Sequence, residues 1–297
     1  MRILNFGSLN IDYVYKLDHF VCRGETILSK SLHIYPGGKG LNQSIALRRA
    51  GLEIYQAGCI GADGNFLLDV LKNSDIDINN ITILKNKRTG NAIIQNEKSG
   101  DNCIILYGGA NQLITKKQVD KVLLGFKKGD YLVLQNEINQ MEYIIDSAYK
   151  IGMTIALNPS PMNEKIKKLD LQKIDIFILN EIEAGQILNT NSKDENILLN
   201  GLLEKFPNAK IVLTLGGNGS CYIDKIHRIR QDIYKVDVVD TTAAGDTFCG
   251  YFLAELAKNK SIKKSMEFAA KAAAIAVTKS GASPSIPTYQ EVENYKF

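Results

Sequence analysis

The chain has 297 residues, of which 45% are hydrophobic and 23% charged, a balance typical of a folded globular protein and not of a disordered one. Its 36 Lys and Arg residues exceed its 32 Asp and Glu residues only slightly. They are spread along the chain, which argues against nucleic acid as a partner. No window approaches the roughly 18 apolar residues of a membrane span, and the first residues resemble neither a signal peptide nor an anchor. Five dispersed cysteines without a C-x-x-C pair indicate a reducing compartment, so we expect a cytoplasmic protein.

Short β-branched runs alternate with stretches of helical periodicity along most of the chain. The predicted strands lie at residues 3–6, 55–60, 131–134, 154–157, 176–179 and 211–215. The predicted helices lie at residues 41–50, 66–72, 141–151, 248–258 and 266–279. This alternation is typical of a parallel sheet that is covered by helices on both faces, and it predicts an α/β fold.

Two segments interrupt this alternation. Residues 11–35 are predicted to form two or more strands with a turn at Arg23 and Gly24, and residues 91–107 are predicted to form a hairpin around Lys98-Ser99-Gly100. Together they could form a small sheet beside the main domain. We therefore predict a β-lid made of residues 11–35 and 91–107, and a core made of residues 1–10, 36–90 and 108–297.

The strongest local motif is Asp240-Thr-Thr-Ala-Ala-Gly-Asp246, which follows a predicted strand at 234–239 and opens the helix predicted from 248. Small residues and the N–H groups of a helix N-terminus favour an anion. An acidic residue beside such a site can take a proton from a hydroxyl that attacks a phosphate. Taken alone, Asp246 would more often be a helix cap.

A second glycine-rich turn, Pro36-Gly-Gly-Lys-Gly-Leu-Asn-Gln43, precedes the helix predicted at 41–50. Its glycines allow close backbone contact with a polar ligand, and Lys39 and Asn42 offer donors. The motif lacks the spacing of a phosphate-binding P-loop, so on its own it is better explained as an ordinary turn.

A third turn, at residues 214–219, ends the strand predicted at 211–215, where open α/β sheets bind ligands. The alternative is a simple hairpin turn into residues 221–223. No G-x-G-x-x-G motif joins a first strand to a helix, which disfavours a nicotinamide-dependent dehydrogenase.

Near the N-terminus, Asn10 and Asp12 lie two residues apart and would face the same side of an extended chain. Such a pair can bind neighbouring hydroxyls of a sugar, or it can form a turn. His19, His33 and His227 are scattered without the spacing of metal ligands, so we interpret them as surface or packing residues.

Taken together and in this order, these segments resemble the ribokinase family, the group also called phosphofructokinase-B-type carbohydrate kinases, from Gly7 to Pro287. The two family signatures correspond to residues 37–51 and 240–248. The resemblance is greatest to the members that phosphorylate ribose. The stretches that carry it lie at residues 7–12, 24–26, 109–111, 158–161, 180–183 and 281–285.

This resemblance implies a three-layer α/β/α sandwich with a mostly parallel central sheet and a small β-sheet lid. It also implies an ATP-dependent kinase that phosphorylates D-ribose at O5. A kinase of the same family for deoxyribose, fructose or a nucleoside is the alternative. A sensor protein without catalysis is disfavoured because Asp246 and Gly245 are intact.

The resemblance further assigns roles to individual residues. It implies Asp246 as the base, beside an anion hole formed by Ala243, Ala244 and Gly245. The implied sugar-binding positions are Asn10, Asp12, Gly38, Lys39, Asn42, Glu137 and Asp246. The implied ATP-binding positions are Asn180, Thr214, Leu215, Gly216, Gly217, Asn218, Gly219, Gly245 and Ala270.

The resemblance also implies Mg²⁺ with the nucleotide, an activating K⁺ ion, and a homodimer that forms through the lid. The implied K⁺ positions are Asp240, Thr242, Ala276, Lys279, Gly281 and Ser285, several of which would act through backbone carbonyls, the ligands that suit K⁺. Some relatives carry His or Asn where this chain has Ala270, which leaves the contacts to the adenine base open.

Overall fold

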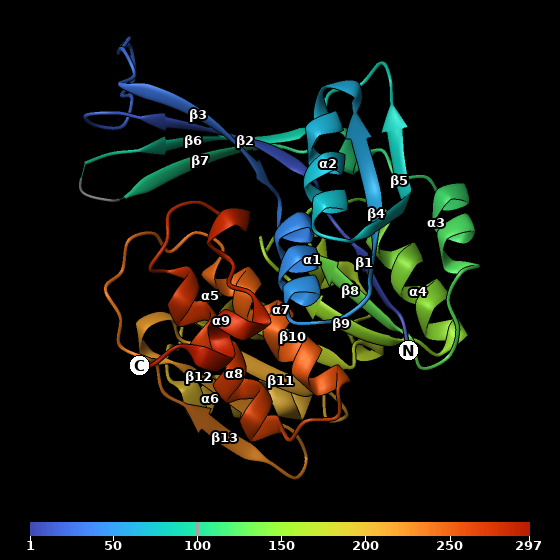
Figure 1. The fold of residues 1–297 in the computed structure, drawn as a ribbon. Coiled ribbons are helices and arrows are strands. Elements are labelled where there is room, and N and C mark those ends of the chain that lie inside the picture. The colour runs from blue at the N-terminus through green and yellow to red at the C-terminus, as the bar shows by residue number, and fades with distance from the viewer. Residues whose placement is uncertain (99–100) are drawn as a thin grey trace.

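The computed structural model describes residues 1–98 and 101–297, so Ser99 and Gly100 of the predicted hairpin turn lie outside the described residues. A large sheet forms the centre of the molecule, with the strand order β13-β12-β11-β10-β9-β8-β1-β4-β5 (Figure 1). From β11 to β5 the neighbouring strands are parallel, and β12 and β13 continue the sheet in antiparallel pairs. The strands are β1 (Ile3–Phe6), β4 (Ile54–Gly61), β5 (Asp77–Leu84), β8 (Tyr131–Gln135), β9 (Thr154–Asn158), β10 (Ile176–Asn180), β11 (Lys210–Thr214), β12 (Ser220–Ile223) and β13 (Arg228–Gln231).

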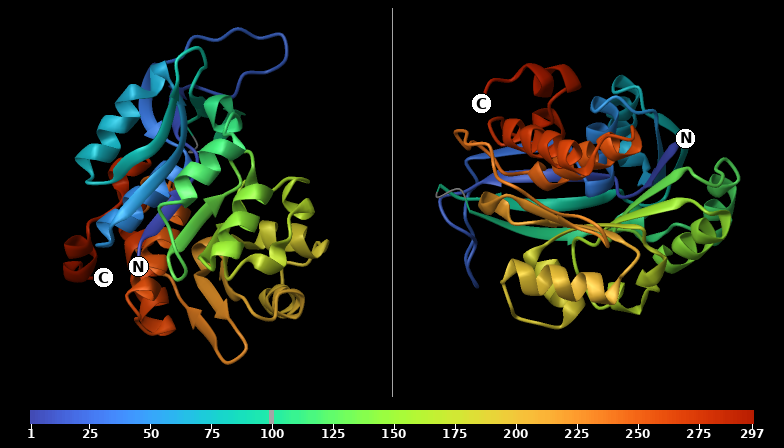
Figure 2. Two further views of the ribbon diagram at one scale, coloured as in Figure 1. Left: turned by 90° about the vertical axis from the view of Figure 1, so that its right-hand side faces the viewer. Right: turned by 90° about the horizontal axis from the view of Figure 1, so that it is seen from below.

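Helices cover both faces of this sheet, as Figure 2 shows from two further directions. One layer contains α1 (Lys39–Arg49), α2 (Asn65–Asn73), α7 (Ala244–Ala257), α8 (Ile262–Ala276) and α9 (Tyr289–Asn294). The opposite layer contains α3 (Lys116–Leu123), α4 (Met141–Ile151), α5 (Glu181–Leu188) and α6 (Glu195–Lys205). The predicted three-layer α/β/α sandwich is confirmed.

The strand sequences explain why the sheet has a buried core on each face. Leu4 and Phe6 of β1 pack toward α3 to α6, while Ile3 packs toward the other helical layer. In β8, Leu132 packs toward α3 to α6 and Val133 packs toward the other helical layer. Side chains alternate between the two faces of a strand, so a strand that is buried on both faces reads as a continuous apolar run.

A separate small sheet has the strand order β3-β2-β6-β7 and projects from the large one (Figure 1). Its strands are β2 (Asn10–Lys16), β3 (Ser31–Gly37), β6 (Gly90–Asn96) and β7 (Asn102–Tyr107). The chain enters β2 directly after β1, and α1 follows β3 directly. The end of the small sheet where Asn10 of β2 pairs with Gly37 of β3 is therefore held close to the carboxyl ends of the large sheet.

The strand predicted at 234–239 is wrong, because no strand is assigned to these residues. Instead, the N–H groups of Val239 and Asp240 donate to the carbonyl of Val277 after α8, at 2.8 and 3.2 Å. Tyr234 and Val236 belong to no strand, and they line a pocket beside α7. The apolar residues that suggested a strand therefore form part of the wall of this pocket.

Helix α7 begins at Ala244, four residues before the predicted start at 248. Its N-cap residue, Ala243, has a left-handed backbone with φ of 61°. The motif around Asp246 is therefore part of the first helical turn itself. In the part of the chain that the structure describes, no helix has both the length and the apolar character needed to cross a membrane.

Candidate active site

Asp246 lies where α7 meets α1. Its two carboxylate oxygens accept hydrogen bonds from Asn42 Nδ2 and Gln43 Nε2, each at 3.0 Å. The side chain is only 8% exposed. The structure thus brings the two signature turns together, although they are more than 200 residues apart in the chain.

The same turn of α7 opens onto a pocket. Ala244 and Gly245 line it, while Asp246, the next residue, faces α1. A Cβ atom on Gly245 would meet no atom within 4 Å, so the backbone is open there. The first N–H groups of a helix have no partner within the helix, which suits them to a negatively charged ligand.

Glu137, which follows β8, is bound to the turn before α1. It accepts a hydrogen bond from the backbone N–H of Lys39 at 3.0 Å and another from the Ser8 hydroxyl. Ser8 in turn accepts from the N–H of Gly40 at 3.2 Å. Gly38 precedes the helix with φ of +92°, a conformation that L side chains rarely adopt.

Asn10 and Asp12 lie on β2 and face the same side of the small sheet, as their spacing predicted. The Asn10 Oδ1 atom accepts from Asn111 Nδ2 at 2.7 Å, and Asn111 Oδ1 accepts from the N–H of Leu9. Within the described part of the chain the Asn10 NH₂ group donates to no side chain or carbonyl, so it is available to a ligand. The Asp12 carboxylate lies flat on Gly37, where a Cβ atom would come within 2.0 Å of it.

The charged groups around Lys39 and Asp246 strongly affect one another. Burial, together with repulsion from Glu137 and Asp246, raises the pKa of Asp12 from 3.8 to about 7. Burial also raises the pKa of Glu137. Burial acts to lower the pKa of Lys39, but attraction by Asp246 and Glu137 outweighs it and the pKa is raised. The carboxylates of Asp12, Glu137 and Asp246 thus lie near the half-buried ammonium group of Lys39.

One buried acceptor beside Asp246 has no hydrogen-bond donor in the described ranges. Asn42 is 6% exposed, and its Oδ1 atom has no partner among the described residues. Buried polar atoms are almost always hydrogen-bonded. A ligand hydroxyl would satisfy this oxygen.

The pocket beside α7 has a volume of about 710 Å³. The predicted nucleotide residues that line it are Asn180, Thr214, Gly216, Gly217, Gly219, Gly245 and Ala270. Leu215 and Asn218 do not line it: Leu215 is buried in the core, and the carbonyl of Asn218 accepts from Arg230. Residues 214–219 also form the turn of an antiparallel hairpin between β11 and β12, so the simpler interpretation of this turn is correct as well.

The pocket has a polar end and an apolar end. Cβ atoms on Gly216 and Gly217 would meet nothing within 4 Å, so their backbone can approach a ligand closely. Val238 and Phe248 belong to the apolar wall, and Ala270 adds only a methyl group. A few polar groups in a mostly apolar cavity are typical of a nucleotide-sized site.

Asn180 caps α5 in a capping box with Glu183, which is why the helix begins directly at the end of β10. Burial raises the pKa of Glu183, which interacts with Lys39 and Asp246 as well. Sequence reasoning did not include Glu183 among the site residues.

The predicted K⁺ residues lie near the start of α7. Asp240 Oδ1 accepts from the N–H and hydroxyl of Thr242, and its Oδ2 accepts from the N–H of Gly281 at 2.9 Å. The Lys279 ammonium is turned away toward Glu291, at 2.7 Å. Ala276 and Ser285 are buried. Among the described residues, no cluster of His, Cys, Asp and Glu side chains could hold a metal, so an ion here would depend on backbone carbonyls.

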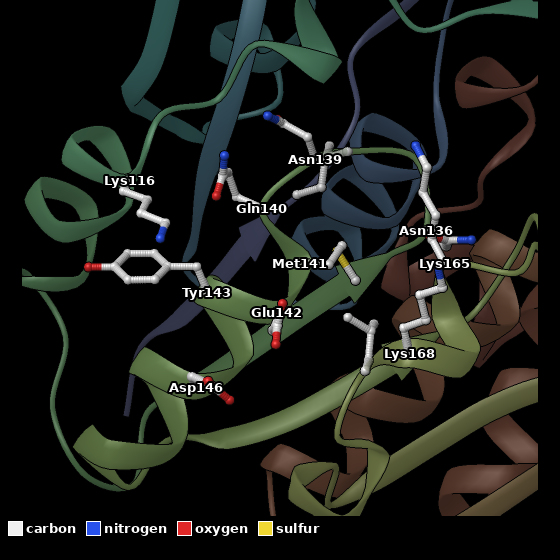
Figure 3. Close-up of a pocket in the computed structure, with 12 residues that line it drawn as sticks. Lys116, Asn136, Asn139, Gln140, Met141, Glu142, Tyr143, Asp146, Lys165 and Lys168 are labelled. Carbon is white, nitrogen blue, oxygen red and sulfur yellow. The ribbon is translucent and has the colours of Figure 1, made fainter.

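A second hollow of about 640 Å³ lies beside the N-terminus of α4. Figure 3 shows Lys116 close to the ring of Tyr143, with the Lys116 ammonium 4.9 Å from the ring centre. None of the predicted site residues lines this hollow.

Besides Glu183, three further residues of the site were not predicted: Gln43, Ser8 and Asn111. Each contacts a predicted residue through its side chain. All three lie within stretches that carry the family resemblance, at residues 7–12, 37–51 and 109–111, so these stretches were the available signal.

Comparisons with known proteins agree with this geometry. The family described as pfkB family carbohydrate kinase matches residues 2–289. A ribokinase of Haemophilus influenzae is 35% identical over 291 residues, covering 96% of this chain and 95% of that protein. A ribokinase of Staphylococcus aureus is 33% identical and covers 98% of both.

Solved structures share the fold over nearly the whole chain. A ribokinase from Cryptococcus neoformans in complex with ADP has a TM-score of 0.87 at 32% identity, covering 98% of each chain. A ribokinase from Arabidopsis thaliana complexed with ribose and ATP has a TM-score of 0.86 at 26% identity, covering 99% of each chain.

Proposed function

Because this chain belongs to the pfkB family of carbohydrate kinases, we propose that it transfers the γ-phosphoryl group of ATP to O5 of D-ribose, with Asp246 as the base. Relatives named ribokinase, 30–35% identical over nearly their whole length, support this acceptor. One observation carries the assignment. The Asp246 carboxylate is held by Asn42 and Gln43 beside a pocket that Ala244 and Gly245 line.

The sugar binds between β2 and the turn before α1 in this proposal. Asn10, Asp12 and Glu137 would bind its hydroxyls, with Lys39, Asn42 and the backbone of Gly38 on the other side. The carboxylates near Lys39 and the unpaired Asn42 Oδ1 atom support a polyhydroxy ligand. Asp12 and Glu137 favour a free sugar because each can accept from a hydroxyl group.

ATP occupies the pocket of about 710 Å³, with its phosphates near Asn180, the Thr214 turn and the N-terminus of α7. Thr214, Gly216, Gly217 and Gly219 offer backbone and hydroxyl groups, while Leu215 and Asn218 only shape the turn. Ala270 lies on the wall that would face the base. Mg²⁺ would be held by the phosphate oxygens and by water more than by protein side chains, and it would neutralise part of the phosphate charge.

Asp246 accepts the proton of the attacking hydroxyl as that oxygen approaches the γ-phosphorus. The N–H groups of Ala243 and Gly245 then face the negative charge that grows on the transferred group. The N–H of Ala244 can join them only by giving up its hydrogen bond to the carbonyl of Thr241, at 3.2 Å. Oriented donors at the site of growing charge are the largest expected contribution to phosphoryl transfer. Catalysis depends mainly on positioning and electrostatics, so the exclusion of water matters.

An activating K⁺ ion would bind behind this anion hole. Asp240 and Thr242 on one side and the carbonyls near Ala276, Lys279, Gly281 and Ser285 on the other supply oxygen ligands, the type that suits K⁺. The hydrogen bond from Gly281 to Asp240 supports a shared site, because it joins these two segments. The ion would stiffen the turn that carries the N–H donors.

The small sheet acts as a lid over the sugar. Its segments, 11–35 and 91–107, close on a core made of residues 1–10, 36–90 and 108–297, and a second copy of the chain packs on it to form a homodimer. Exposed apolar side chains on the small sheet support this pairing; they include Leu32, Ile34, Ile104 and Ile105. We place the enzyme in the cytoplasm, where ATP is available.

The Asp246→Asn variant tests the base. It keeps the shape of the side chain and an oxygen that can accept from α1, but it cannot take a proton. We expect kcat to fall by about 10³-fold or more while the Kd for ATP changes little, because proton transfer and ordering of the attacking oxygen are both lost. ADP release with ribose and with nucleosides, with and without K⁺, measures turnover and acceptor choice. Turnover close to that of the unmodified enzyme would remove Asp246 as the base.

A further inference from the structure

A row of buried side-chain amides runs from Asp246 into the centre of the large sheet. Gln43 Nε2 donates to Asp246 Oδ1 at 3.0 Å, and Gln43 Oε1 accepts from Gln135 Nε2 at 2.7 Å. Gln135 Nε2 also donates to Asn5 Oδ1 at 3.0 Å. Gln43, Gln135 and Asn5 are each at most 1% exposed.

The far end of this row fixes the orientation of every amide in it. Asn5 Nδ2 donates to the carbonyl oxygen of Gly40, which can only accept. Asn5 therefore accepts from Gln135 through its Oδ1 atom, and Gln135 must donate this hydrogen bond through its NH₂ group. The same NH₂ group of Gln135 donates a second hydrogen bond, to Gln43 Oε1.

Gln43 is left with its NH₂ group for Asp246. If Gln43 were reversed, its oxygen would face the carboxylate and its NH₂ group would face that of Gln135, so both contacts would become repulsive. The row thus directs a donor to Asp246 Oδ1, while Asn42 supplies a donor to Oδ2.

We propose that Gln43 is a positioning residue for the base, and that Gln135 and Asn5 keep its amide in the donating orientation. The proposal rests on the proposed function of Asp246. The two donors hold the plane of the carboxylate and leave its remaining lone pairs for the hydroxyl of the sugar. Hydrogen bonds to a carboxylate favour its ionised form, which is the form that a base requires.

Other charged groups face Asp246 as well. They are Lys39 on α1, Asp12 on β2, Glu137 after β8 and Glu183 on α5, and the buried Cys249 on α7, whose raised pKa keeps its thiol neutral, faces it too. All of these groups remain in a Gln43 variant. A change in the pH profile of its kcat is therefore due to the loss of the Gln43 amide.

The first test replaces Gln43 by Met, which has a similar volume and no donor. We expect kcat to fall about ten- to a hundredfold, the range for one hydrogen bond to a charged group, with KM for ATP changed less than about twofold. The acid limb of the kcat profile moves to higher pH because the ionised carboxylate has lost a donor. Gln135→Met should give a smaller loss with a shift in the same direction.

The second test, Gln43→Glu, keeps the shape and the acceptor for Gln135. Its protonated carboxyl can still donate to Asp246, whereas its ionised form repels it. Turnover should then be best preserved at low pH and decline as pH rises, opposite in sign to Gln43→Met. This variant also keeps the proposal testable if Gln43→Met does not fold.

Gln118→Met is the matched control. This amide also makes two hydrogen bonds, to the carbonyl of Gly58 and from the Cys59 thiol, but it contacts no site residue. Its kcat and pH profile should match those of the unmodified enzyme. Thermal unfolding of all the variants separates lost stability from lost turnover.

Two outcomes separate this inference from the proposed function. If Asp246→Asn abolishes turnover but Gln43→Met and Gln43→Glu keep normal kcat values and pH profiles, the positioning role is wrong and the base remains. If Asp246→Asn stays active, the base itself is wrong, and the inference fails with it.

Discussion

The pKa of the Asp12 side chain is set by its surroundings in the fold and not by its neighbours in the sequence. The alternation of Asp12 with Asn10 along β2 predicted that both would face one side, and they do. Its pKa of about 7 comes from burial and from Glu137 and Asp246, which come from distant parts of the chain. No local pattern could have indicated this.

The raised pKa of Asp12 predicts a specific pH dependence of stability. Between about pH 4 and 7 the folded state binds more protons at Asp12 than the unfolded state, so the free energy of unfolding falls as pH rises through this window and then levels off. Asp12→Asn removes the effect. The free energy of unfolding of Asp12→Asn should exceed that of the unmodified protein by close to zero at pH 4 and by at most about 4 kcal/mol at pH 8.

Urea unfolding at the two pH values measures this difference. Asp120→Asn is the control, because Asp120 is exposed on α3, where its carboxylate accepts from the Tyr143 hydroxyl. An Asp12→Asn gain that is the same at pH 4 and pH 8 would contradict the prediction.

Elements with a strong apolar period were predicted well, and half-exposed elements were not. Helix α4 has the predicted bounds of 141–151 because one face packs into the core and its period is clear. Strand β5 was missed, since it lies at the edge of the large sheet and its sequence, DINNITIL, has no buried apolar run. The site was recognised from its turns, but the contacts of Gln43 depend on the packing of α1 against α7, which neither motif encodes alone.

At Gly250, helix α7 packs closely against α1. A Cβ atom there would lie 2.4 Å from the Cβ of Ala46 and 2.9 Å from the N of Leu47. The backbone of α1 cannot yield as a flexible side chain would, so Gly250→Ala must push the helices apart. This would move Asn42 and Gln43 away from Asp246.

We therefore expect Gly250→Ala to lower the free energy of unfolding by about 1–3 kcal/mol, the usual cost of overpacking. We also expect it to lower kcat by about tenfold or more, because a misplaced catalytic group loses rate steeply. Gly125→Ala is the control, since its Cβ would approach nothing closer than 3.4 Å at an exposed position. Unchanged turnover in a destabilised Gly250→Ala protein would show that the helix contact does not position the base.

At the scale of the whole molecule, the small sheet carries several exposed apolar side chains. It projects beyond the helices (Figure 1), and Ile34 and Ile105 on it are 55% and 60% exposed. Ile34 pairs with Tyr13 of β2, Tyr13 with Ile93 of β6, and Ile93 with Ile105 of β7, so these side chains form a row across the sheet. Contiguous apolar surface of this kind favours association with a partner surface.

If a second copy covers this row, Ile34→Lys and Ile105→Lys should convert a dimer to a monomer, because burying an unpaired ammonium in an apolar interface is unfavourable. KM for the sugar should rise in the same variants, since the lid that carries Asn10 and Asp12 loses its support. Ile197→Lys on α6 is the matched control, with 56% exposure at a site far from the small sheet, and it should keep the assembly of the unmodified protein. Light scattering after size-exclusion chromatography measures the mass. A monomeric unmodified protein, or a dimer that persists in both lid variants, would show that the lid does not join two copies.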